Sequence, residues 1–337
     1  MMSTQGYGFL CFSLLISLIR TSGAGDEVPC DGMHRKEVLV IIGIETGGTK
    51  VVCAAASRPR EIIDIQTLPT STPDQTLNGI GAFIARHRLH GDLEAIGIGA
   101  FGPLDLDPDS PTFGAIGATP KRGWQGVRVL DRVSEAAGCP AVLETDVAAA
   151  AIGEQRWGAG TGLLDLTYVT VGTGIGVGAL AMGRPLHGLG HPEAGHLTVR
   201  RHPEDDVDGV CRLHGDSLEG LASGPAIAAR FGRPADALGD RESRAVSMEA
   251  YYLAQLTTAL VYILAPQRVI LGGGVMQLPG LLDAVRVATA RLLGGALGDH
   301  PASQPASGFL TGPGLGVRAG IVGALTMAAD LRASGRP

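Results

Sequence analysis

Short runs of aliphatic and β-branched residues alternate along the chain with longer segments whose apolar residues recur every three or four positions. The short runs predict strands and the longer segments predict helices, because these are the spacings of buried side chains on each element. Predicted strands cover residues 38–44, 51–56, 95–100, 141–144 and 268–271, with a further hairpin over 166–180. Predicted helices cover residues 74–89, 147–156, 253–264, 281–293 and 318–333, and residues 236–244 and 294–313 are predicted to be loops.

Two glycine-rich turns each separate a pair of strand-like runs, one within residues 43–50 and the other at residues 172–176. The residues after each turn are small or β-branched, so each turn predicts the tip of a β-hairpin. A helix after the turn would instead indicate a P-loop or a dinucleotide-binding fold. Two hairpins that face each other can enclose the phosphates of a nucleotide from both sides. The pattern therefore indicates a two-lobed phosphotransferase.

The residues at these tips suit phosphate binding. Glycine lets backbone N–H groups approach a phosphate closely, a hydroxyl adds a hydrogen bond, and a lysine adds positive charge. Glu45 in the first turn could order a water on Mg²⁺, and a third turn after strand 268–271 could pack against the nucleoside. Tight glycine turns with incidental polar residues remain the alternative. The candidate ATP and phosphate residues are Gly47, Gly48, Thr49, Lys50, Thr173, Gly174, Gly176, Gly272, Gly273 and Gly274.

An acidic residue, Asp146, stands where a short predicted strand ends and an alanine-rich helix begins. The N-terminus of a helix stabilises a carboxylate, so one interpretation is that Asp146 is only the N-cap of this helix. The other interpretation is that Asp146 is a general base, which takes a proton from a substrate hydroxyl. The local pattern leaves both interpretations open.

One cysteine and two histidines form a candidate metal site. Cys211 and His214 have the spacing of metal ligands, and His196 precedes them at a distance that a loop can close. Structural zinc sites normally have four protein ligands, whereas this set provides three. The alternative is a polar loop with a free thiol.

Composition narrows the class of protein. The 337 residues suffice for one large domain or two medium ones, and a net charge of −6 without a basic run argues against nucleic-acid binding. Five irregularly spaced cysteines do not form a disulfide pattern, which favours a reduced, cytoplasmic protein. The apolar run at residues 7–19 resembles a signal peptide, but no basic residue precedes it. We expect residues 1–37 to be a poorly ordered or mis-started extension, with Met33 as an alternative start.

Taken together, these segments resemble the ROK family of sugar kinases, and within it the bacterial fructokinase branch. The resemblance runs from about residue 38 to the C-terminus, and the Cys-x-x-His spacing at residues 211–214 favours the fructokinase branch. The matching segments are the first phosphate loop at residues 44–50, the sugar-side turn at 101–105, the segment after it at 119–121 with Trp124, the catalytic-aspartate motif at 144–146, the second phosphate loop at 172–176, the hexose signature at 193–196 and the fructokinase stretch at 218–226.

The resemblance implies an α/β, two-lobed, actin-like (ribonuclease H-like) ATPase fold with the active site in the cleft between the lobes. The small lobe would comprise residues 38–146 plus 318–337, and the large lobe, residues 147–317, would carry the zinc-type loop. The implied protein is a homodimer that phosphorylates a hexose, D-fructose first, with ATP and Mg²⁺, and that binds neither nucleic acid nor membrane. Asp146 would be the general base, and Zn²⁺ would bind His196, Cys211 and His214. The implied sugar-binding residues are Gly102, Pro103, Thr145, Asp146, Glu193, His196 and Glu219.

Two positions depart from the family pattern. Ser217 stands where relatives typically have a fourth zinc ligand, a cysteine, and neutral serine is a poor zinc ligand. Ala148 stands where many relatives have asparagine. The enzyme alternatives are glucokinase, mannokinase and N-acetylhexosamine kinase. A sugar-responsive repressor would need a helix-turn-helix before the first loop, for which residues 1–37 are too few and too apolar. A non-catalytic sugar-binding protein would not need Asp146 together with both phosphate loops.

Overall fold

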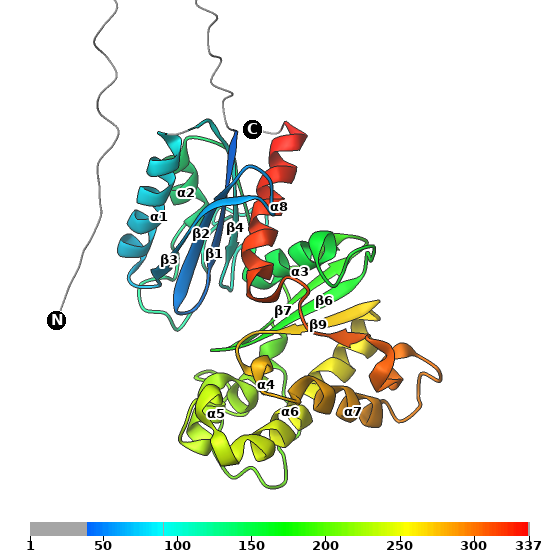
Figure 1. Cartoon of the computed structure of the whole chain (residues 1–337). Coiled ribbons are helices and arrows are strands. Elements are labelled where there is room, and N and C mark those ends of the chain that lie inside the picture. The colour runs from blue at the N-terminus through cyan, green and yellow to red at the C-terminus, as the bar shows by residue number, and fades with distance from the viewer. Residues whose placement is uncertain (1–38, 90, 336–337) are drawn as a thin grey trace, which may run out of the picture. The chain divides into compact units, whose positions relative to one another are not determined.

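Two five-stranded sheets organise the described part of the chain, which in this computed structural model comprises residues 39–89 and 91–335 (Figure 1). The strand orders are β3-β2-β1-β4-β5 and β8-β7-β6-β9-β10. In both sheets the first three strands along the chain run antiparallel and the last two add in parallel. The two sheets therefore share one topology, with a glycine-rich turn between the first two strands of each. The strands are β1 (Val40–Thr46), β2 (Lys50–Ala56), β3 (Ile62–Pro69), β4 (Leu93–Ala100), β5 (Ala141–Thr145), β6 (Leu166–Val171), β7 (Ile175–Ala181), β8 (Arg184–Pro185), β9 (Arg268–Gly272) and β10 (Leu310–Thr311).

Helices cover both faces of the first sheet. On one face, α1 (Pro73–Arg88) and α2 (Val129–Ala137) share a core with alternate residues of β1 and β2. On the other face, α8 (Ala319–Ser334) packs against β1 and β4 (Figure 1). The approach of α8 to β4 is close because Gly97 has no side chain, and a Cβ there would overlap the carbonyl oxygen of Ala324. A larger residue at position 97 would separate α8 from the sheet.

The second sheet is also covered on both faces. Its largest core joins β6 and β9 to four helices, α4 (Leu218–Ala222), α5 (Gly224–Phe231), α6 (Glu242–Leu264) and α7 (Leu281–Leu293). Its other face packs against α3 (Asp146–Trp157), which also contacts α8, so α3 and α8 lie between the two sheets (Figure 1). Short 3-10 helices cover Ala194–His196, Ala235–Ala237, Gly239–Arg241, Val275–Gln277, Pro301–Ser303, Pro305–Ser307 and Gly316–Arg318.

The local pattern predicted most of these elements. Both hairpins are confirmed, and the helix predicted over residues 281–293 has these bounds in the structure. The loop predicted over 236–244 is wrong at its end, because α6 begins at Glu242 with a polar, mostly exposed turn that carries little apolar signal. Strands β3, β8 and β10 and helices α2, α4 and α5 were not among the predicted segments, and β10 lies within the loop predicted over residues 294–313. For β3 the physical reason is its place at the sheet edge, where Ile63 and Ile65 are exposed and polar residues interrupt the run.

The predictions for residues 1–37, including a start at Met33, lie outside the described residues, as does the strand start predicted at residue 38. The lobe boundaries at residues 146–147 and 317–318 stay a prediction. The three cysteines of the described part are free thiols. Among the helices of that part, none is both long enough and apolar enough to cross a membrane.

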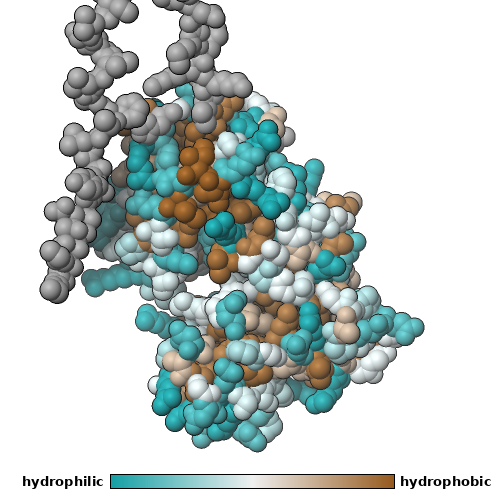
Figure 2. Space-filling model, viewed as in Figure 1, coloured by the Kyte–Doolittle hydropathy of each residue, from teal (hydrophilic) through white to brown (hydrophobic). Residues whose placement is uncertain are grey.

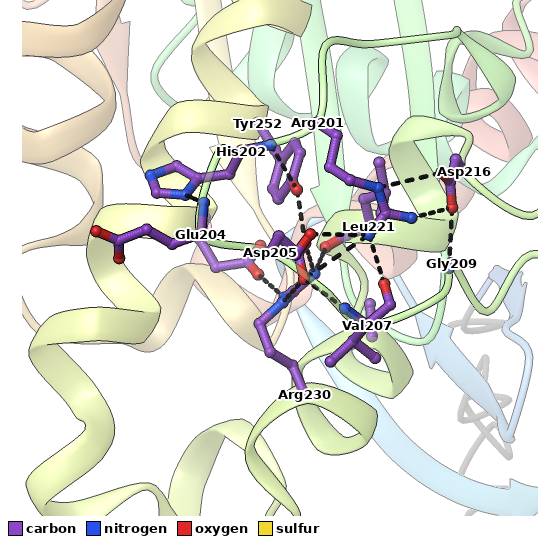
Figure 3. Close-up of polar contacts among 12 residues, drawn as sticks. Arg201, His202, Glu204, Asp205, Val207, Gly209, Asp216, Leu221, Arg230 and Tyr252 are labelled. Atoms are coloured by element: carbon purple, nitrogen blue, oxygen red, sulfur yellow. Dashed lines mark hydrogen bonds and ion pairs between the residues drawn. The ribbon is translucent and has the colours of Figure 1, made fainter.

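A buried ion pair anchors the loop that carries Cys211 and His214 (Figure 3). The carboxylate of Asp205 accepts hydrogen bonds from Nε and Nη2 of Arg230 at 3.0 and 2.7 Å, and one from the hydroxyl of Tyr252 at 2.6 Å. Burial alone would raise the pKa of Asp205, but these bonds hold it below its ordinary value. Because Arg230 lies on α5 and Tyr252 on α6, protein contacts fix the course of this loop.

Candidate active site

Asp146 is the first residue of α3, directly after β5. The N-cap of α3 is Thr145, whose hydroxyl accepts a hydrogen bond from the backbone N–H of Ala148 at 3.1 Å. The interpretation of Asp146 as only an N-cap is therefore wrong. Its carboxylate accepts a hydrogen bond from the N–H of the next residue, Val147, at 2.9 Å. Because Thr145 caps α3, the carboxylate of Asp146 is available to act on a substrate.

The environment of Asp146 raises its pKa to about 7, first through burial, then through the negative charges of Glu45 and Glu193. Glu45 lies at the end of β1, whereas Glu193 precedes the 3-10 helix Ala194–His196. Asp146 thus lies within electrostatic reach of carboxylates from both halves of the molecule. A carboxylate with a near-neutral pKa can accept a proton from a hydroxyl at physiological pH.

The first glycine turn lies at the tip of the β1–β2 hairpin. The N–H of Gly47 donates to the carbonyl of Lys50 at 2.8 Å, and the turn from Gly48 to Lys50 is exposed. Glu45 faces away from this tip, since its carboxylate packs over Gly320 and accepts a hydrogen bond from the N–H of Ile321 at the start of α8. Burial raises the pKa of Glu45, an effect that the charge of Lys50 opposes.

The second and third glycine turns lie side by side at one edge of the second sheet, because β6 and β9 are neighbouring parallel strands. Gly273 has a φ of +96°, a conformation that side chains disfavour, and a Cβ there would lie 2.5 Å from the backbone nitrogen of Val171. Only glycine allows this approach. Gly176 lies beside α3, where a Cβ would come within 2.9 Å of Cγ1 of Val147. The structure thus brings residues 172–176 and 272–274 together, close to the start of the helix that carries Asp146.

The predicted sugar-side residues converge from both halves of the molecule. A Cβ on Gly102 would lie 2.9 Å from Cε1 of His191 and 3.5 Å from Oε1 of Glu193. The sugar-side turn and the hexose signature are therefore neighbours. Glu219 takes another position, because its Oε2 accepts a hydrogen bond from the N–H of Ile175 in the second glycine turn at 3.0 Å.

Two histidines in this region were not among the predicted site residues. His191 accepts a hydrogen bond at Nε2 from the N–H of Leu104 at 2.9 Å. His187 lies 3.0 Å from Oε2 of Glu144, and this hydrogen bond raises the pKa of His187. Each contact joins segments distant in the sequence, so no local pattern indicated it.

The candidate metal ligands also converge. The ligand atoms of His196, Cys211 and His214 all lie within 4.8 Å of one another. Ser217, at the fourth position, is buried as the N-cap of α4, where its hydroxyl accepts a hydrogen bond from the N–H of Gly220 at 3.3 Å. Burial raises the pKa of the Cys211 thiol, but hydrogen bonds, the one with Ser217 foremost, lower it below its ordinary value. A cysteine that ionises readily, beside two imidazoles, suits Zn²⁺.

Comparison with known proteins places this site in a family context. A family model described as ROK family matches residues 41–330. A fructokinase of Zymomonas mobilis subsp. mobilis (strain ATCC 31821 / ZM4 / CP4) is 40% identical over 289 residues, which are 85% of this chain and 95% of that protein.

Solved structures agree. The ROK hexokinase from Thermus thermophilus matches with a TM-score of 0.69 and 28% identity, over 88% of this chain and all of that one. A ROK family glucokinase from Streptomyces griseus, in complex with glucose and AMPPNP, matches with a TM-score of 0.69 and 26% identity, over 86% of this chain and 99% of that one. These likenesses confirm the predicted two-lobed α/β kinase fold.

Proposed function

The chain belongs to the ROK family, and on that premise we propose that it transfers a phosphoryl group from ATP to the 6-hydroxyl of D-fructose. The observation that carries the proposal is the carboxylate of Asp146, which lies at the start of α3, does not serve as the N-cap of that helix and has a near-neutral pKa. The fructokinase name of the Zymomonas mobilis relative supports the sugar, and AMPPNP in the Streptomyces griseus structure supports ATP.

In the proposed reaction, Asp146 takes the proton of the 6-hydroxyl as that oxygen attacks the γ-phosphoryl group and ADP leaves. Gly102 and Pro103 would hold the sugar together with Glu193 and His196, and Thr145 would complete the pocket. Glu219, predicted beside the sugar, would instead support the second glycine turn through Ile175. Backbone N–H groups of the three glycine turns, with Thr49, Lys50 and Thr173, would bind the phosphates of ATP. The homodimer, the cytoplasmic location and the lobe boundaries are part of this proposal.

Magnesium fits the proposed site. The negative charge of Glu45 raises the pKa of Asp146, and a divalent cation bound near them would offset this repulsion. Glu45 would hold Mg²⁺ through a water molecule. When bound with ATP, Mg²⁺ neutralises negative charge on the phosphates.

The decisive test is ADP release by the purified protein with ATP, Mg²⁺ and a panel of hexoses. We expect fructose to give the highest kcat/KM. The Streptomyces griseus structure with glucose makes glucokinase the second candidate. A higher kcat/KM with glucose would favour a glucokinase, and a higher kcat/KM with mannose would favour a mannokinase. Absence of ADP release with every hexose would contradict the kinase assignment. The remaining candidate functions would then be a sugar-responsive regulator and a non-catalytic sugar-binding protein.

The pH dependence of kcat/KM should reflect Asp146. The base acts as a carboxylate, and because its pKa is raised to about 7, activity should fall as the pH drops through about 7. An ordinary aspartate would lose activity only near pH 4. We expect Glu45→Gln, which removes a negative charge that raises this pKa, to move the acid limb to lower pH. Glu135→Gln, on an exposed position of α2, is the control that should leave the limb in place. A limb near pH 4 in the unaltered protein would contradict the raised pKa of Asp146.

We propose that Zn²⁺ binds through His196, Cys211 and His214, since their donor atoms converge. Ser217→Cys would add a fourth ligand, a second thiolate beside Cys211, and should raise zinc affinity at least about tenfold, measured by competition with a chelator. Ser223→Cys is a matched control, because Ser223 is the buried N-cap of α5 and so tests the loss of a cap alone. Equal zinc affinity of the unaltered protein and Ser217→Cys would show that three ligands suffice.

A further inference from the structure

The chain contains three lysines, and two of them lie at the first glycine turn. Lys50 belongs to the turn itself. Lys121 comes from the connection between β4 and α2, yet its ammonium donates a hydrogen bond to the carbonyl of Gly48. The connection thus delivers a second positive charge to the tip of this hairpin.

Lys121 is held in place by aromatic packing. Its Nζ lies 4.8 Å from the centroid of the Phe101 ring, a cation–π distance. The edge of Trp124 packs against Phe101 at 5.1 Å between centroids, and Trp124 is buried with its indole N–H bonded to the carbonyl of Ser71 at 3.0 Å. Burial also lowers the pKa of Lys121. The ammonium is therefore partly desolvated and fixed on a rigid support, which strengthens its interaction with an anion.

Lys121 contacts two segments that the proposed function assigns to different substrates. Gly48 is in the turn proposed to bind phosphates, and Phe101 directly precedes the sugar-side residues Gly102 and Pro103. On the proposed function, the transferred group leaves the nucleotide at the first of these segments and reaches the hexose at the second. The Gly48 carbonyl is a neutral partner for this partly buried ammonium, whereas a phosphoryl group offers anionic oxygens, which bind a cation more strongly.

We propose that Lys121 is a catalytic residue, whose Nζ exchanges the Gly48 carbonyl for a non-bridging oxygen of the phosphoryl group in transfer. This inference rests on the proposed function. In the step, the bond from phosphorus to the leaving ADP oxygen breaks and the bond to the hexose oxygen forms. The hydroxyl proton goes to Asp146, and Lys121 keeps its proton and stabilises the charge on the transferred group.

The variant Lys121→Met tests this, because methionine keeps an unbranched side chain and removes the charge. We expect kcat with fructose to fall about 10²- to 10³-fold. Isothermal titration should show that the Kd for AMPPNP rises about tenfold, while the Kd for ADP, which lacks a γ-phosphate, changes less than about twofold. Lys121→Arg, which keeps the charge, should recover part of kcat. Arg122→Met removes an exposed charge from the next residue and should leave all three values unchanged.

The main competing explanation is that Lys121 only holds the turn through Gly48. Loss of that structural contact would weaken ADP and AMPPNP alike and would lower the melting temperature of Lys121→Met. Either that result or a kcat near that of the unaltered protein would overturn the proposal. If the unaltered protein phosphorylates no hexose, the proposed function fails by itself. The difference between ADP and AMPPNP still decides whether Lys121 contacts the γ-phosphate.

Discussion

Asp146→Asn should give a folded protein whose turnover of fructose is about 10²- to 10⁴-fold slower. The amide has nearly the size of the carboxylate but cannot accept the proton of the attacking hydroxyl. Folding should be preserved because Thr145, not Asp146, caps α3. Removing a carboxylate that burial and neighbouring charges disfavour should even make the variant slightly more stable at neutral pH.

Steady-state ADP release at saturating fructose and ATP, with thermal melting alongside, checks this expectation. Asp283→Asn is a matched control, since Asp283 also lies in the first turn of a helix, α7, but its side chain is 77% exposed. The control should keep full activity. Turnover by Asp146→Asn within about threefold of the unaltered protein would remove Asp146 from the mechanism, because loss of a general base costs far more.

Arg230→Met should destabilise the protein by about 3–5 kcal/mol, because it removes the buried cation that lies between two buried carboxyl groups. As a cationic partner, Asp205 would keep Arg201, whose Nη1 lies 4.0 Å away. Arg230 is 6% exposed, and its partners Asp205 and Glu249 are fully buried as side chains. Burial raises the pKa of Glu249 well above its ordinary value, so Glu249 can become neutral. Asp205 would lose both guanidinium bonds, and most of the cost should arise there.

Urea denaturation followed by circular dichroism measures this loss, read as a lower transition midpoint. Arg233→Met removes the same charge from an exposed position just after α5, and it should change the free energy of unfolding by less than about 0.5 kcal/mol. Tyr252→Phe removes one hydrogen bond to Asp205 and one from the N–H of His202. Its loss of stability should lie between those of the two arginine variants, at about 1–3 kcal/mol. Equal midpoints for Arg230→Met and Arg233→Met would contradict the role given to this ion pair.

The local sequence pattern was sufficient to predict those elements whose formation depends on neighbouring residues in the chain. The two hairpins and α3 follow from glycine turns between apolar runs and from an alanine-rich segment. The identity of the α3 cap was beyond this reasoning, since Thr145 and Asp146 are adjacent and both are good caps. Only the backbone geometry selects Thr145.

Contacts between distant segments had no local signal. The hydrogen bond between His191 and Leu104 forms only because folding brings together two loops that are distant in the sequence. The same holds for the hydrogen bond between Lys121 and Gly48. The edge strand β3 was missed for a related reason. Two of its isoleucines, Ile63 and Ile65, are exposed, so its apolar positions do not mark a buried face as those of a core strand do. The candidate metal ligands could be listed from spacing, whereas the role of Ser217 as a helix cap required the fold.

The packing of α8 on the first sheet has a consequence for biosynthesis. The apolar residues of this contact are buried in the folded protein, and the space-filling view shows further apolar residues at the surface over the upper half of the molecule, where the first sheet and α8 lie (Figure 2). As the nascent chain leaves the ribosome, the strands that contribute Ile41 and Ala95 emerge long before Leu325, the residue that packs against them. One apolar face of this sheet must therefore stay bare while the whole second half is translated. Translation that stalls after α7 would expose a ready surface for aggregation, which makes the growing chain a natural client for ribosome-associated chaperones.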